Sequence, residues 1–140
     1  MPDQPALLIE HWLPIEAIGA ESKRERGASS ALPPLYFLHV WWARRPLTTS
    51  RAAILASVLP QWLPVWPASL LEKSPNEETY HQWFLQLNGI FGDPAKARKL
   101  LDWAKQQGTS IANPYGHARA FTVNPSAEDL QTMGDLLEYT

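Results

Sequence analysis

Cysteine is absent from this sequence of 140 residues. Its absence excludes a disulfide framework and any metal site built on thiolates, and it fits a reducing compartment. Long hydrophobic runs are also missing, because no apolar segment reaches the roughly 20 residues that a membrane-spanning helix needs. The first residues, MPDQPALLIEHW, lack the basic and apolar regions of a secretory signal. We therefore expect a cytoplasmic protein that has no membrane partner.

Recognisable catalytic motifs are equally scarce. The four histidines are scattered, and no pair of them has the spacing of metal ligands. The sequence contains no G-x-S-x-G, no phosphate-binding loop and no G-x-G-x-x-G. The run Asn113-Pro114-Tyr115-Gly116 shares letters with the (D/N)PP(Y/F) box of amino-methyltransferases. It has only one proline and no glycine-rich donor site before it, so it predicts a turn. We expect no catalytic residue and no metal in this chain alone, which leaves open whether it belongs to an enzyme.

Charge is distributed unevenly along the chain. The whole sequence has a net charge of −2, yet residues 19–51 carry +4. This segment holds Lys23, Arg24, Arg26, Arg44, Arg45 and Arg51 against Glu21 and Glu25. A basic segment in an otherwise acidic chain indicates a local anionic partner. Pairing of these arginines with internal carboxylates is an alternative that stays equally open.

The second half of the sequence predicts three helices. Asn76, Asp93 and Ser126 are N-cap residue types, and each precedes a segment with helical spacing of apolar residues. Glycines at positions 89 and 108 end the first two segments. We expect the apolar stripes to be core, and we expect Trp83 and Trp103 to serve packing alone. The stripes are Tyr80, Trp83, Phe84 and Leu87; Ala97, Leu100, Leu101 and Ala104; Leu130, Met133 and Leu137.

The first half is less regular, because most of its segments are interrupted by proline. We expect residues 5–13 to form a short strand or an extended arm, residues 15–21 a brief helix and residues 22–34 a loop. A helix should follow Pro46, with Leu47, Ile54, Leu55, Val58 and Leu59 on one side. Residues 60–69 are a proline-broken connector, and residues 120–123 are a candidate short strand.

Residues 1–140 are thus predicted to form a single small helical domain with an irregular, proline-rich N-terminal half. The predicted fold class is mainly α, with α+β containing one or two short strands as the alternative.

The arginines around Pro46 are the main candidates for a binding site. Arg51 lies on the apolar stripe of its predicted helix, so its permanent charge needs a carboxylate, a group of carbonyls or a ligand anion. Arg44 and Arg45 precede a helix N-terminus, which favours a phosphate or a carboxylate. Folding back of Glu10, Glu16 or Glu21 would satisfy the same groups. Trp41 and Trp42 point to opposite sides if the chain is extended, and a solvent-facing Trp42 beside His39 could stack on a nucleobase. The candidates for contact with DNA or a cofactor are His39, Trp42, Arg44, Arg45 and Arg51.

One long string adds a family resemblance. The residues His39-x-Trp41-Trp42-Ala43-Arg44-Arg45-Pro46-Leu47-x-x-Ser50-Arg51-Ala52, together with Leu8-Ile9-Glu10 and Glu21-Ser22, resemble the N-terminal region of adenine-specific DNA methylases, known as domain of unknown function 1156. The similarity covers roughly residues 7–60. In that family a glycine-rich donor loop and a DPPY box lie further along a longer chain, and neither motif occurs here.

The resemblance implies a non-catalytic N-terminal domain of an adenine-specific DNA methyltransferase, working in restriction or phage defence. Its implied partners are DNA and the remainder of the methyltransferase, on the same or a separate chain. S-adenosylmethionine is the implied cofactor of the parent enzyme. Residues 46–54 resemble the helix start that holds the methionine end of that cofactor in amino-methyltransferases, which would turn Arg44, Arg45 or Arg51 toward the donor carboxylate or the DNA backbone. The alternative is a structural or protein-interaction module that buries the Trp41-Trp42 and Arg44-Arg45 segment against a partner domain or subunit.

Overall fold

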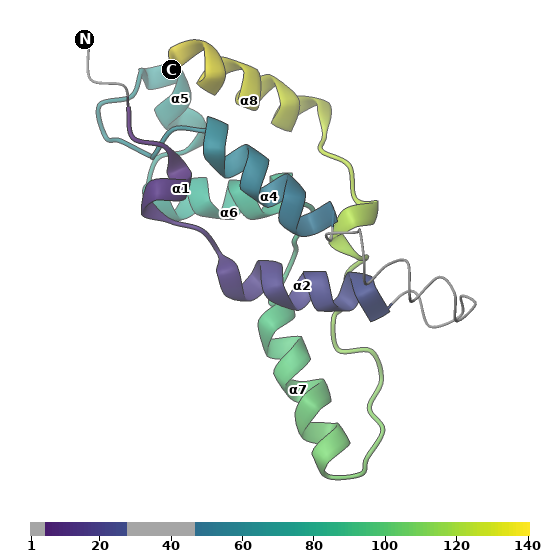
Figure 1. Ribbon diagram of the computed structural model, residues 1–140. Helices are drawn as coiled ribbons and strands as arrows, with labels where there is room; N and C mark the ends of the chain where they lie inside the picture. Colours follow the sequence, from purple (N-terminus) through teal and green to yellow (C-terminus); the bar gives the residue numbers. More distant parts are fainter. Residues whose placement is uncertain (1–4, 28–46) are drawn as a thin grey trace.

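The computed structural model describes residues 5–27 and 47–140 (Figure 1). Four of the five candidate contact residues, His39, Trp42, Arg44 and Arg45, lie outside the described residues. The described part is helical, and its only β structure is an isolated bridge between Leu7 and Pro60. The predicted mainly α class is therefore confirmed. The elements are α1 (Leu8–His11), α2 (Ile15–Gly27), α4 (Leu47–Val58), α5 (Ala68–Lys73), α6 (Glu77–Leu87), α7 (Pro94–Gln106), the 3₁₀ helix η1 (Ala120–Thr122) and α8 (Ala127–Tyr139).

The helix starts of the second half follow the sequence closely. Asn76 caps α6 by accepting a hydrogen bond from a backbone N–H of the first turn, and Asp93 does the same for α7. Ser126 and Asp129 exchange hydrogen bonds in a capping box at the start of α8. These caps satisfy N–H groups that have no partner inside the helix, and they depend only on residues within the same turn. All three predicted starts are confirmed.

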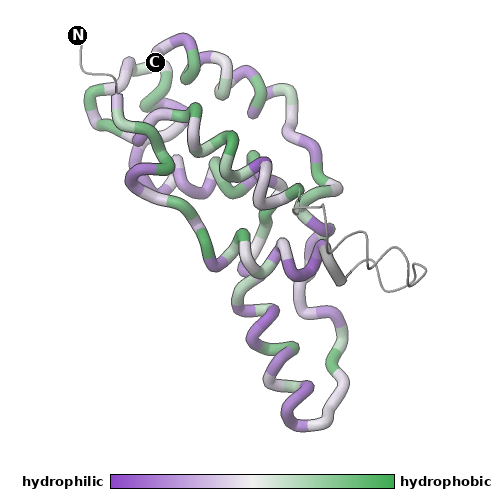
Figure 2. The backbone as a smooth tube through the Cα atoms, viewed as in Figure 1, coloured by the Kyte–Doolittle hydropathy of each residue, from purple (hydrophilic) through white to green (hydrophobic). Residues whose placement is uncertain are grey.

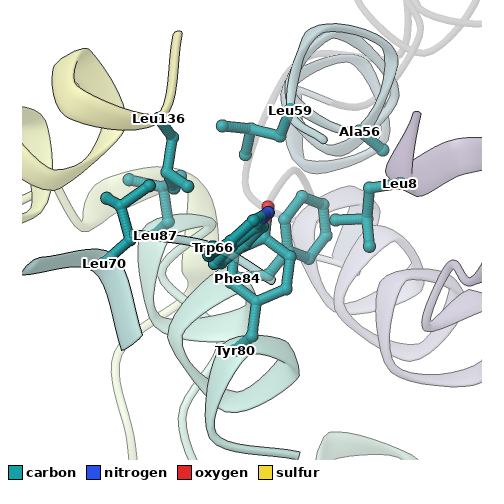
Figure 3. Close-up of a cluster of buried hydrophobic side chains, with 9 residues drawn as sticks. All are labelled: Leu8, Ala56, Leu59, Trp66, Leu70, Tyr80, Phe84, Leu87 and Leu136. Carbon is teal, nitrogen blue, oxygen red and sulfur yellow. The ribbon is translucent and has the colours of Figure 1, made fainter. Parts of the chain in front are cut away.

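The larger core gathers around α6. Figure 3 shows side chains from α1, α4, α5, α6, α8 and the 59–67 connector meeting in one cluster. Tyr80 and Phe84 of α6 are fully buried, and Trp66 meets the Tyr80 ring edge to face at a centroid distance of 5.1 Å. The Tyr80 hydroxyl donates to the Pro60 carbonyl at 2.8 Å, which gives the buried phenol its hydrogen-bond partner. The buried members are Leu8, Ala56, Leu59, Trp66, Leu70, Tyr80, Phe84, Leu87 and Leu136.

A second, smaller cluster joins α2 and α4 to the chain around α6 and η1. Its buried members are Ile18, Ala52, Ile90 and Ala120. Helix α2 crosses the start of α7, and α7 with the segment after it projects away from the other helices (Figure 1). Figure 2 shows α7 as largely hydrophilic with isolated hydrophobic positions. The fold thus consists of a helical body and a projecting arm, with α2 between them.

Several local predictions for the first half were wrong. Residues 8–11 form a helix instead of a strand or an arm, although residues 6–7 and 60–61 do pair in an extended manner. Helix α2 runs to Gly27, six residues beyond its predicted end, because side chains of its last turns find partners elsewhere in the fold. The candidate strand at 120–123 is the 3₁₀ helix η1. The connector predicted over residues 60–69 is non-helical from 60 to 67, but residues 68–69 already belong to α5, which begins directly after Pro67.

The predicted apolar stripes were only partly correct. In α4 the side chains of Leu47, Ile54 and Val58 are exposed, whereas Ala52 and Ala56 face inward. Leu100, Leu130 and Leu137 are also exposed. Trp103 is 55% exposed, so it does not pack in the core as expected. These helices carry apolar residues on more than one side, and the covered side depends on which neighbours the tertiary fold supplies.

Candidate functional site

The N-terminus of α4, which the sequence predicted as an anion site, is occupied by a carboxylate of the chain itself. Glu25 Oε1 accepts from the backbone N–H of Leu47 at 2.8 Å. Glu25 Oε2 accepts from the backbone N–H and the hydroxyl of Thr48, at 3.2 and 3.0 Å. The negative charge also lies at the positive end of the helix dipole. Glu25 therefore supplies, from inside the fold, the anion that this helix end favours.

Arg51 is turned toward backbone carbonyls. Its Nη1 atom donates to Val123 O at 3.0 Å, to Asn88 O at 3.3 Å and to Ala120 O at 3.5 Å. These carbonyls belong to the end of α6, to η1 and to the residue that follows η1. The predicted need for a definite partner is met here by a group of carbonyls, which were one of the three kinds of partner expected. Arg51 thereby fastens the 120–123 segment to α4 and α6, and its role as a DNA or cofactor contact stays a prediction.

The junction where the 120–123 segment meets α4 and the end of α6 also depends on a close approach of two backbone segments. Gly89 has φ +75°, and a Cβ at this position would lie 2.5 Å from the Ala120 carbonyl oxygen. Only glycine tolerates this conformation and this contact together. The neighbouring Asn88 is buried, and its side-chain N–H donates to Phe84 O at 2.8 Å. The junction is therefore a tightly packed polar structure inside the fold.

An ion pair within α2 fastens the chain after α7 to this helix. Glu21, whose side chain is buried, accepts from Arg24 Nη1 at 3.3 Å and from the Ala120 N–H at 3.1 Å. Arg24 also donates to the carbonyls of His117 and Ala118, and its guanidinium lies 4.2 Å from the centroid of the Tyr115 ring. A buried carboxylate needs such partners to remain charged. Residues 115–120, which have little regular structure, are held in place by this pair.

Sequence reasoning identified the kind of partner at the start of α4 but not the residue. It named Glu10, Glu16 and Glu21 as carboxylates that could fold back, whereas Glu25 caps α4. Glu16 instead pairs with Lys99 at 2.7 Å, and Glu10 accepts from the Leu7 N–H of its own turn. The missed signal was the length of α2. If the helix had been extended past residue 21, Glu21 and Glu25 would have been predicted one turn apart on the same side.

The side chain of His81 is largely covered by its neighbours. Its ring stacks on Trp12 with centroids 3.7 Å apart, and it packs beside the main core. Burial lowers the pKa of His81 below its usual value, while the Glu77 carboxylate 3.8 Å away opposes this shift. The shift favours the neutral ring near pH 7. The stacking and the core contacts give His81 a packing role.

The residues at the start of α4 can be compared with what a metal ion or the carboxylate of S-adenosylmethionine would need there. The described residues contain no group of three or more metal-ligating side chains, and none of the described helices could cross a membrane. A donor carboxylate at the start of α4 would meet the Glu25 carboxylate, which already accepts both backbone N–H groups. Two carboxylates within hydrogen-bond reach of the same N–H groups would repel each other. This helix end therefore does not fit the methionine carboxylate of S-adenosylmethionine.

Comparison with known proteins gives one match. The family described as "Protein of unknown function (DUF1156)" matches residues 12–85, which include α2, α4, α5 and most of α6. No curated protein and no solved structure matches the chain. The match covers just over half of the 140 residues. The chain therefore belongs to the DUF1156 family.

Proposed function

We propose that the chain is a non-catalytic domain of an adenine-specific DNA methyltransferase acting in restriction or phage defence, and that it contributes a contact to DNA. The observation that carries this proposal is the string from His39 to Ala52, whose residues resemble the N-terminal region of such enzymes. Membership of the DUF1156 family fits the resemblance, because the matched span contains the whole string. The methyl transfer itself would belong to the remainder of the enzyme.

A non-catalytic role is supported by how the buried Glu21 and the half-buried Arg24, Glu25 and Arg51 use their charges. Arg51 and Arg24 donate to backbone carbonyls, and Glu21 and Glu25 accept from backbone N–H groups. A catalytic acid or base must instead present an atom to a substrate at hydrogen-bond distance. These four groups stabilise the junction of α2, α4 and the 115–123 segment.

A DNA contact is favoured over a cofactor contact. The start of α4 is closed to a second carboxylate by Glu25. The basic segment 19–51 has cations besides Arg24 and Arg51, whose guanidinium groups bind carbonyls. Lys23 is exposed, and Arg44 and Arg45 precede α4 in the sequence. Fixed cations of this kind attract the phosphate backbone without reading sequence.

The test is the DNA affinity of Arg45→Gln compared with Lys73→Gln, by fluorescence anisotropy of a labelled duplex at low salt. Each variant removes one positive charge, and Lys73 lies on α5, paired with Asp135 at 3.0 Å. We expect Arg45→Gln to weaken binding about threefold to tenfold and Lys73→Gln to leave it unchanged. Equal effects of the two variants would mean that Arg45 contributes only net charge.

The exposed side of α4 favours a second candidate function, a protein-interaction module. Leu47, Ile54 and Val58 are 59%, 65% and 43% exposed and lie along one side of a helix whose only charged residue is Arg51. Arg51 has the same helical spacing, but its guanidinium is bound to backbone carbonyls, so the three exposed apolar side chains remain available to another protein surface. Light scattering of the wild type and of Ile54→Glu tests this function. A larger mass for the wild type that falls to the monomer in the variant would support self-association through α4.

A further inference from the structure

Trp103 is an exposed residue of α7. Helix α7 belongs to the arm that projects from the helical body (Figure 1). Trp103 belongs to the last turns of α7, and its side chain is 55% exposed. The buried side of α7 consists of Pro94, Ala97 and Ala104, so the helix attaches to the fold without using its tryptophan. A single exposed ring is ordinary on a protein surface, so the residues around Trp103 decide whether it belongs to a binding surface.

The residues around Trp103 are cationic or amide-bearing. Lys96, Lys99, Trp103 and Gln106 follow one another at spacings of three, four and three residues, which places them on one side of the helix, and all four are exposed. Lys99 also pairs with Glu16 of α2 at 2.7 Å. The outward side of α7 therefore presents a tryptophan framed by ammonium and amide groups.

The whole arm is positively charged in a chain whose net charge is −2. Residues 94–119 hold Lys96, Arg98, Lys99, Lys105 and Arg119 against Asp102 alone, a net charge of +4. If the neighbouring carboxylates Glu16 and Asp93 are counted as well, the region keeps +2. Residues 103–127 contain no carboxylate at all. A surface of this composition attracts a polyanion and offers it little repulsion.

The same features weigh against two other occupants. A helix that lies in a membrane interface needs a continuous apolar side, whereas only Leu100 and Trp103 are large exposed hydrophobics on α7. A protein partner of ordinary composition would not require a surface with a net positive charge and exposed lysines, since lysine is depleted at protein interfaces. Lysines interleaved with an exposed aromatic ring are instead typical of surfaces that bind single-stranded nucleic acid.

We infer that the outward side of α7 binds a single strand of DNA, with Trp103 stacked on an unpaired base and Lys96 and Lys99 beside the phosphates. This inference rests on the proposed DNA contact and adds a location and a strand preference to it. Bases in an intact duplex are already stacked on their neighbours, so a ring on a helix surface reaches only a base that is unpaired or displaced. The arm would therefore hold the strand near a site where a base is extruded.

The experiment measures binding of a fluorescein-labelled single strand of about 16 nucleotides, and of the matching duplex, by anisotropy at low salt. The variants are Trp103→Ala, Trp103→Phe, Lys96→Gln and the charge-matched control Lys73→Gln. Val65→Ala, at a residue 75% exposed outside the arm, is the control for loss of an exposed apolar side chain. Circular dichroism and sedimentation of each variant report folding and mass.

We expect the wild type to prefer the single strand and Trp103→Ala to lower its affinity about tenfold, with Trp103→Phe retaining most of it. Lys96→Gln should weaken binding and reduce the slope of affinity against salt by about 0.7, while both controls match the wild type. If the wild type binds and Trp103→Ala binds equally well, the α7 inference is wrong and the proposed DNA contact survives. If the wild type binds no DNA, both fail. Loss of anionic-vesicle binding or of a dimer in Trp103→Ala, with DNA affinity unchanged, would assign the surface to a membrane or to a second copy and overturn the inference.

Discussion

Replacement of Arg51 by methionine should destabilise the fold substantially. Methionine keeps much of the length and apolar stem of the side chain but removes the donor that serves Val123, Asn88 and Ala120. A hydrogen bond to a charged group contributes about 1.5–3 kcal/mol, and three carbonyls that share one donor atom do not add independently. We therefore expect the free energy of unfolding to fall by about 2–4 kcal/mol.

The assay is equilibrium unfolding in urea, followed by circular dichroism. Arg98→Met is the matched control, because Arg98 pairs on the surface of α7 with Asp102 at 3.2 Å. Loss of a surface pair four residues apart should cost no more than about 0.5 kcal/mol. Arg51→Lys keeps the charge and one donor, so it should lie between the wild type and Arg51→Met. An unfolding free energy for Arg51→Met within about 0.5 kcal/mol of the wild type would refute the carbonyl-fastening role.

Three further predictions concern the same fold. Glu25→Ala removes the cap of α4 and should cost about 1 kcal/mol in urea unfolding, and an unchanged midpoint would contradict the capping role. Gly89→Ala should be more destabilising than Gly108→Ala by about 1 kcal/mol or more, because both have positive φ but only the first Cβ would meet a backbone oxygen. Since the folded pKa of His81 is lowered from 6.5, its contribution to stability is complete above that pH and is lost as the pH falls below it. The loss of thermal stability between about pH 7.5 and pH 5.5 should be smaller in His81→Gln, and an equal loss would exclude His81 as the cause.

Features of the fold that depend on residues within one helical turn could be predicted from the sequence, whereas features that depend on tertiary packing could not. The caps by Asn76, Asp93 and Ser126 act within one turn, so residue types at fixed spacing were sufficient to place α6, α7 and α8. The exposure of Trp103 and Leu47 could not be predicted in this way. Both residues have apolar spacing in their helices, and only the packing of neighbouring helices decides which side is covered.

The candidate site shows the same limit. Residue chemistry predicted that Arg51 and the start of α4 need partners, because an unpaired buried charge and unpaired N–H groups are both costly. The partners come from elements distant in sequence: the α4 cap is Glu25 of α2, and two of the Arg51 carbonyls lie about 70 residues away. The DNA and cofactor roles of His39, Trp42, Arg44 and Arg45 stay predictions, since these residues lie outside the described part of the chain.

The proposed DNA contact is tested most directly by the affinity of the wild-type chain for DNA at two salt concentrations. If several lysines and arginines contact phosphates, the dissociation constant measured by anisotropy should rise at least about tenfold between roughly 50 and 200 mM salt. Absence of binding at the lower concentration, or an affinity that does not change with salt, would contradict the proposal.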